Sequence, residues 1–201
     1  MNRSAKQLPL FESPRDYRRF LDVLVEAEHR HDMRLLEYCV MPNHFHLLVW
    51  PRRDGDLSRY LRWTTGVHAQ RWRLDRQTPG KGAVYQGRYR WVAVQDDAHL
   101  DIVRRYIVQN PVRAGLARDV FVWPWSSAGV LDVGTRPTLT TECRPAPRNL
   151  GEILDADLAR CLAEGLSARP TFGSARWRFA LDVELLLDAA GRPADRSTPR
   201  P

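Results

Sequence analysis

The stretch MPNHFHLLVW, residues 41–50, decides the fold. A proline and an asparagine near its start favour a turn, and the branched and aromatic residues after them favour a half-buried strand. Because side chains alternate along a strand, we expect His44 and His46 on one face and Phe45 and Leu47 on the other. Two imidazoles held this way can bind one metal ion. The alternative is two ordinary histidines on a polar sheet face, since two ligands alone do not make a metal site.

The segments around this stretch predict an α+β fold, in which an antiparallel sheet is backed by helices. A first helix should begin at Ser13, the N-cap, with Pro14 in its first position. The turn at 41–43 should fold one strand back onto the next as a hairpin. The predicted elements are a helix over 14–31, strands over 35–40 and 44–50, a helix over 57–76, a strand over 89–95 and a helix over 98–109.

The ends of the later helices follow from local signals. Asp96 or Asp97 should cap the helix over 98–109, and Pro111 should end it, because a proline disfavours helical geometry in the residue before it. The 201 residues suffice for one domain, expected over 1–130. Residues 131–201 read as a linker, a helical extension with patches near 153–164 and 174–190, and a flexible tail.

The composition favours a polyanionic partner. The formal net charge is +7, and only two of the 31 basic residues are lysines. Arginine binds phosphate oxygens in pairs and stacks on bases, although a GC-rich genome also enriches arginine. Three distant cysteines fit neither a disulfide framework nor a cysteine-based zinc site. No apolar run is long enough to cross a membrane, so we expect a cytoplasmic, nucleoid-associated protein.

A second motif is RRYIVQNPVRAGL, residues 104–116. Tyr106 and Asn110 are four residues apart, so they share one face of the predicted helix. The positive field of Arg104, Arg105 and Arg113 should lower the cost of a phenolate and attract phosphate. The alternative is that the tyrosine is an amphipathic core residue with its hydroxyl at the rim.

A third feature is a basic and aromatic segment over residues 59–91. Arginines that alternate with rings suit single-stranded nucleic acid, where bases stack and phosphates are held. The alternative is a solvated helix face with buried tryptophans, and helical spacing favours a packed position for His68 over a role as metal ligand. The candidate DNA contacts here are Arg59, Arg62, Trp63, Arg71, Arg73, Arg76, Lys81, Arg88 and Arg90.

These motifs carry a resemblance. YCVMPNHFHLLVWP, followed about 45 residues later by RRYIVQNPVRAGL and then by WPWSS, resembles the REP-associated tyrosine transposases, a branch of the HUH single-tyrosine transposases of the IS200-like kind. The resemblance covers roughly residues 10–127. It implies a ferredoxin-like core, with a divalent cation (Mg²⁺ or Mn²⁺) bound by His44, His46 and Asn110. It also implies that Tyr106 attacks single-stranded or hairpin DNA and forms a 5′-phosphotyrosine link. The protein would act as a monomer or a homodimer.

One departure from the family keeps a second reading open. In the family, a strand precedes the segment that matches residues 2–4, whereas this sequence starts there. We therefore expect either a start further upstream or a sheet that lacks a strand beside the histidine strand. The second case would suit an inactive protein that binds DNA hairpins without cutting them. A histidine-triad nucleotide hydrolase fits less well, because the third alternating position is Leu48.

Overall fold

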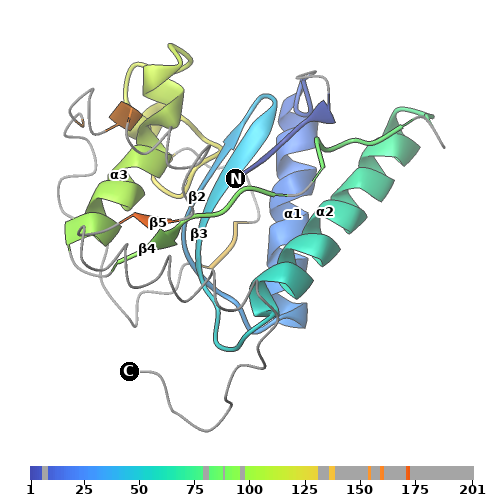
Figure 1. Cartoon of the computed structure of the whole chain (residues 1–201). Coiled ribbons are helices and arrows are strands. Elements are labelled where there is room, and N and C mark those ends of the chain that lie inside the picture. Colours follow the sequence, from blue (N-terminus) through green and yellow to red (C-terminus); the bar gives the residue numbers. More distant parts are fainter. Residues whose placement is uncertain are drawn as a thin grey trace, which may run out of the picture.

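The computed structural model describes residues 1–5, 9–78, 82–87, 89–95, 98–130, 136–138, 154, 159–160 and 171–172. Its chain order is helix, hairpin, helix, short strand, helix, with a two-residue strand at each end (Figure 1). The elements are β1 (Asn2–Arg3), α1 (Pro14–Arg30), β2 (Arg34–Met41), β3 (His44–Trp50), α2 (Asp56–Asp75), β4 (Ala93–Val94), α3 (Ala98–Arg113), η2 (Val120–Val122) and β5 (Thr171–Phe172).

A three-stranded antiparallel sheet in the order β1-β3-β2 forms the centre of the molecule. This confirms the predicted hairpin and the antiparallel α+β class. The β2–β3 register shifts between Leu35 and Glu37, so Leu36 is an extra residue. Such a bulge turns two neighbouring side chains to one face. Here both face α3: Leu36 packs in the core on that side, and Glu37 forms an ion pair with Arg104.

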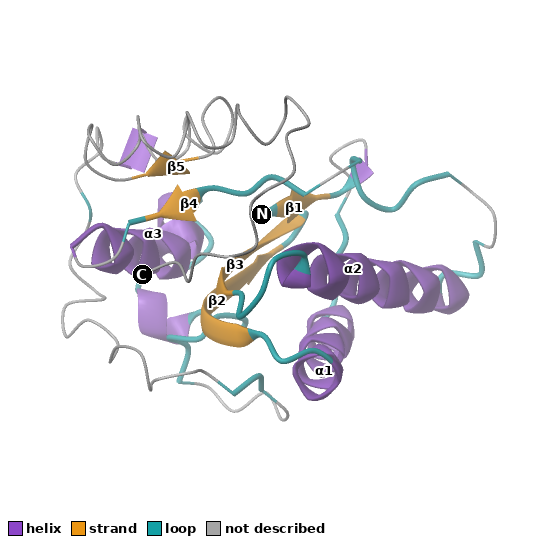
Figure 2. Ribbon diagram, turned by 60° about the horizontal axis from the view of Figure 1, so that its bottom comes forward, coloured by secondary structure: helices purple, strands orange, loops and turns teal. Residues whose placement is uncertain are grey.

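Helices cover both faces of the sheet, as Figure 2 shows: α1 and α2 lie on one side and α3 on the other. The alternation predicted for β3 decides which side chains meet which helix. Phe45 packs with α1 residues in the larger core, and Leu48 packs with α3 residues in the second core. His46, two residues from Leu48, therefore lies on the α3 face, where its ring is near Tyr106.

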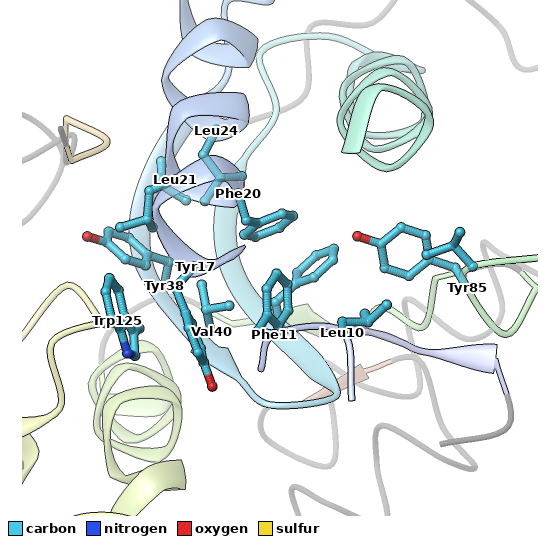
Figure 3. Close-up of a cluster of buried hydrophobic side chains, with 13 residues drawn as sticks. Leu10, Phe11, Tyr17, Phe20, Leu21, Leu24, Tyr38, Val40, Tyr85 and Trp125 are labelled. Carbon is cyan, nitrogen blue, oxygen red and sulfur yellow. The ribbon is translucent and has the colours of Figure 1, made fainter. Parts of the chain in front are cut away.

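The larger core is strongly aromatic (Figure 3). Phe20 of α1 and Phe45 of β3 have ring centroids 4.7 Å apart, and Tyr17 stacks on Trp125 at the same distance. Trp125 comes from the aromatic segment after α3, where residues 125–127 bridge to the outer edge of β2. These rings fix α1 against the hairpin that carries the histidines.

The start of α1 forms as predicted. The Ser13 side chain accepts a hydrogen bond from the Asp16 backbone N–H, the Asp16 carboxylate accepts one from the Ser13 backbone N–H, and Pro14 lies in the first turn. This capping box satisfies helix donors that would otherwise lack partners. At the start of α2, Gly55 has a φ of 80°, a conformation that favours glycine.

The predicted end of the last helix was wrong. α3 continues through Pro111 to Arg113. A proline removes the N–H that would bond to the carbonyl four residues earlier, here that of Ile107. The Asn110 side chain replaces it, because its Nδ2 donates to the Ile107 oxygen at 3.3 Å and to the Tyr106 oxygen at 2.8 Å. A local side-chain donor thus lets the helix continue past the proline.

The strand predicted over 89–95 is much shorter than expected. Only Ala93–Val94 is a strand, β4, and it pairs in parallel with β5 rather than with the central sheet. The residues before it bond instead to the start of the chain, since Arg90 N–H donates to the Met1 oxygen and Ser4 bridges to Tyr85.

The expected empty position beside the histidine strand is partly filled. In β1, Asn2 pairs with Phe45 and Arg3 pairs with His44. Among the described residues, no strand pairs with this edge of β3 beyond those two positions. A cavity of about 370 Å³ lies there, lined by residues of β3, the 89–94 segment and α3.

The later part of the chain is described at few positions. Leu154 and Ala159 pack into the α3-side core, and Arg136 donates to the carbonyl oxygens of Pro124 and Ser126. The helical patches predicted at 153–164 and 174–190, the tail from residue 191 and the Asp96 or Asp97 cap lie outside the described residues. Of the helices described, none combines the length and apolar character needed to span a membrane.

Candidate nuclease site

The two histidines lie together at the start of β3, on the α3 face. Their ring centroids are 5.0 Å apart, with the rings close to perpendicular. Their neighbours across the sheet are Met41 and Cys39 of β2, and Arg3 of β1 lies beside His44. The strand therefore presents both imidazoles from a rigid backbone, as the alternation predicted.

Hydrogen bonding and burial both favour the ligand form of these histidines. His44 Nδ1 lies 2.7 Å from Asn43 Oδ1. An amide oxygen only accepts, so Nδ1 carries the proton and Nε2 keeps its lone pair. Burial, followed by the charge of Arg3, lowers the pKa of His44 to about 4, and burial lowers that of His46 well below its usual range. Both rings are neutral at pH 7, as metal binding requires.

Tyr106 of α3 faces the same pair. Its ring centroid is 6.0 Å from that of His46, nearly perpendicular to it. The guanidinium carbon of Arg113, two turns further along α3, lies 4.9 Å from the Tyr106 ring centroid. The Tyr106 side chain packs into the α3-side core and is 6% exposed. It is therefore a core residue that also borders the histidines.

Arg113 acts on the pKa of Tyr106 in the predicted direction, but burial outweighs it. Burial is the largest influence and raises the pKa of Tyr106 above its usual value, while Arg113 and then Arg3 act against it. Arg104 does not contribute as expected, because it is buried and paired with Glu37, with Nε and Oε2 3.5 Å apart. The phenol is thus protonated at neutral pH.

Asn110 lies one turn after Tyr106 and is half-buried. Its Nδ2 is committed to the backbone of α3, which leaves Oδ1 as an acceptor. Among the described residues there is no group of three or more histidine, cysteine or acidic side chains that could hold a metal. Neutral imidazole nitrogens and amide oxygens are both donor types that divalent cations accept.

The predicted DNA contacts of α2 divide into two groups. Several arginines pair within the protein: Arg71 with Glu26 of α1, Arg76 with Asp16, and Arg59 with Asp56. Arg73 donates to the Gly82 oxygen. These contacts join α2 to α1 or to its own ends, so their first role is structural.

The remaining predicted contacts lie elsewhere on the surface. Arg62 and Arg90 are exposed, and Trp63 is half-buried beneath the guanidinium of Arg30, 5.8 Å from its ring. Arg105 is half-buried on α3. Lys81 and Arg88 lie outside the described residues.

Other tyrosines lack the setting of Tyr106. Tyr85 is buried, with its hydroxyl 2.6 Å from His68 Nδ1. This contact confirms the packed position expected for His68. Tyr60 is fully buried in the α1–α2 core, and the Tyr89 hydroxyl lies 2.8 Å from Ser58 Oγ. None of these rings contacts the histidine pair.

Sequence reasoning missed Arg3 and Asn43. Asn43 was read as a turn residue, although a short polar side chain before the first histidine is a usable signal for an orienting hydrogen bond. Arg3 belongs to a polar N-terminal segment without periodicity. Only the pairing of β1 with β3 brings it beside His44.

Comparison with known proteins identifies the family and the fold. The family model described as "Transposase IS200 like" matches residues 4–110, which begin directly after β1 and end at Asn110 of α3. A solved structure of a REP-associated tyrosine transposase bound to a REP hairpin is similar with a TM-score of 0.51 and 18% identity, over 77% of this chain and 89% of that chain. At this identity the likeness shows the fold. No curated protein matches significantly. The match over more than half of the chain shows that this protein belongs to the IS200-like transposase family.

Proposed function

We propose that the protein is a metal-dependent endonuclease and strand-transferase for single-stranded DNA beside hairpins or palindromic repeats. The observation that carries the proposal is the meeting of Tyr106 with the His44–His46 pair across the β3–α3 interface. The family supplies the class, a DNA transposase. The solved relative is bound to a REP hairpin, which supports a hairpin substrate here.

In the proposed reaction, the Tyr106 hydroxyl oxygen attacks the scissile phosphorus. The Oη–P bond forms, the P–O3′ bond breaks, and the leaving strand takes up a proton as a free 3′-hydroxyl. The product is a 5′-phosphotyrosine, which keeps the phosphodiester energy for rejoining. The raised pKa of Tyr106 means that the phenol must lose its proton during attack, so this step needs a cationic surrounding.

His44, His46 and Asn110 are the proposed ligands of Mg²⁺ or Mn²⁺. A cation bound there offsets the negative charge that develops on the phosphate oxygens. His44 is oriented for this role by Asn43, and the Asn110 amide is oriented by its bond to the Tyr106 carbonyl oxygen. The same hydrogen bond also fixes Asn110 to the turn of helix that carries the nucleophile.

Removing one oxygen from Tyr106 tests the proposal. We would mix the protein with Mn²⁺ and a pool of hairpin oligonucleotides that carry randomised single-stranded flanks. Wild type should cut a subset of them, and Tyr106→Phe should cut none while keeping its affinity for the pool. Tyr89→Phe is the matched control, because the Tyr89 hydroxyl is bound to Ser58 Oγ, so its loss should leave the protein active. Cleavage by Tyr106→Phe at the wild-type rate would refute the mechanism.

A further inference from the structure

Two arginines from different elements, Arg3 of β1 and Arg113 of α3, lie beside the candidate site. Arg3 of β1 pairs in register with His44, and its charge acts on His44, His46 and Tyr106. Arg113, in the last turn of α3, lies over the Tyr106 ring. The two guanidinium groups thus border the tyrosine and histidines from two different elements.

These arginines lack the partners that other arginines of the chain have. No carboxylate among the described residues forms an ion pair with Arg3 or Arg113, whereas Arg71 and Arg76 are each paired with acids of or beside α1. Arg3 Nε is buried and has no hydrogen-bond partner. Among the described residues, the side chains whose charges act on His44, His46 and Tyr106 are Arg3, Arg113 and the neighbouring His44, and none of them is an acid. A buried cationic donor without a partner is costly, so this site favours an anion.

We propose that Arg3 and Arg113 form a phosphate clamp that holds the scissile phosphate of the DNA against Tyr106. Guanidinium forks match pairs of phosphate oxygens. In the attack, they would carry part of the charge that builds up on the non-bridging oxygens, beside the share taken by a metal. Arg3 then becomes a catalytic residue of the chain, supplied by a strand of only two residues. This inference rests on the proposed function, whose DNA substrate it specifies.

A binding experiment without metal tests the clamp separately from cleavage. Fluorescence anisotropy of a labelled hairpin oligonucleotide with a single-stranded flank would be measured in EDTA over a range of salt concentrations. Arg3→Gln and Arg113→Gln should each weaken binding about tenfold. Each should also reduce the slope of log affinity against log salt by about 0.7. Arg15→Gln, which removes the same charge from an exposed position on α1, should match wild type.

Conservative variants separate a clamp from a merely structural role. Arg3→Lys and Arg113→Lys keep the charge but lose the fork, so they should restore the salt slope and only part of the affinity. Circular dichroism checks that each variant is folded. If Arg3→Gln is not, the affinities and salt slopes of Arg113→Gln, which changes an exposed residue, and of the two lysine variants decide whether the clamp exists. Glutamine variants that bind with wild-type slope and affinity would overturn the clamp. If these effects appear but wild type cuts no hairpin, the clamp stands and the proposed nuclease function fails.

Discussion

The arginines between α1 and α2 differ from the two arginines beside the candidate site. On the α1–α2 face, Arg71 and Arg76 are paired with acids and hold one helix to the other. On the α3 face, Arg3 and Arg113 lie beside neutral histidines and a buried tyrosine, and no acid in the described part of the chain pairs with these two arginines. The arginines between α1 and α2 neutralise nearby carboxylates, while Arg3 and Arg113 add positive charge beside the histidines and Tyr106.

This contrast shows why a count of basic residues is a poor guide to a DNA-binding surface. The segment over 59–91 is the most arginine-rich part of the sequence, yet much of its charge is used between helices. Exposed ion pairs contribute little stability, but they do occupy the guanidinium. A phosphate would have to displace a carboxylate there, whereas near Tyr106 it would meet Arg3 and Arg113, which pair with no carboxylate of the described residues.

The largest expected effect comes from removing the imidazoles of the α3 face. His44→Ala combined with His46→Ala should abolish metal-dependent cleavage, because two of three proposed ligands are lost. Calorimetric titration with Mn²⁺ should show binding to wild type and none to the double variant. DNA affinity in EDTA should stay within about twofold, since the phosphate contacts remain. His29→Ala, at an exposed position of α1, is the control. Equal Mn²⁺ binding by wild type and the double variant would exclude these ligands.

Acid should weaken the fold through buried histidines on both faces. Burial lowers the pKa of His68 to about 3 and that of His44 to about 4. The unfolded chain binds these protons near pH 6.5 and the folded chain does not, so stability is full above pH 6.5 and falls as the pH drops towards 3. His68 accounts for up to about 5 kcal/mol of this loss. Urea unfolding at pH 7, pH 5 and pH 3 measures it, and a His68→Gln variant with an unchanged pH dependence would contradict this assignment.

Breaking the buried pair that fixes α3 to β2 should cost nearly as much. Arg104→Leu leaves Glu37 buried beside Ser127 without its cation, and should lower the free energy of unfolding by about 3–5 kcal/mol. Adding Glu37→Leu should restore much of the loss, because no uncompensated charge remains. Urea unfolding of both variants provides the measurement. A single variant as stable as wild type would show that the pair does not anchor the helix.

The smallest effect should come from the paired arginines of α2. Arg71→Gln removes a partly exposed ion pair with Glu26, so it should cost at most about 1 kcal/mol of stability. Its DNA affinity should match wild type at moderate salt, in contrast to Arg113→Gln. Anisotropy under identical conditions compares the two. A loss for Arg71→Gln as large as that for Arg113→Gln would remove the distinction between the two faces.

Local signals predicted much of the fold and the placing of the two histidines on one face of a strand. The cap at Ser13, the turn at residues 41–43 and the alternation of His44 and His46 depend on neighbours in sequence, and each formed as expected. The continuation of α3 depends on one side-chain hydrogen bond from Asn110 that no periodicity reveals. The position of Arg3 depends on long-range strand pairing, which sequence spacing does not encode.

The pairing state of the arginines was equally out of reach from the sequence. Glu26 and Arg71 are 45 residues apart, and their contact exists only because α1 and α2 lie side by side on the sheet. Burial likewise outweighs the effect of the arginines on the pKa of Tyr106, since a sequence shows which charges are near along the chain but not how deeply the ring is packed.

The most direct test is the identity of the residue that binds DNA covalently. Wild type would be incubated with Mn²⁺ and a cleavable hairpin oligonucleotide, denatured, digested with nuclease and protease, and analysed by tandem mass spectrometry. We predict a nucleotide 5′-phosphate attached to Tyr106, and no adduct with Tyr106→Phe. An adduct on Tyr60, Tyr85 or Tyr89, or cleavage without any covalent intermediate, would contradict the account.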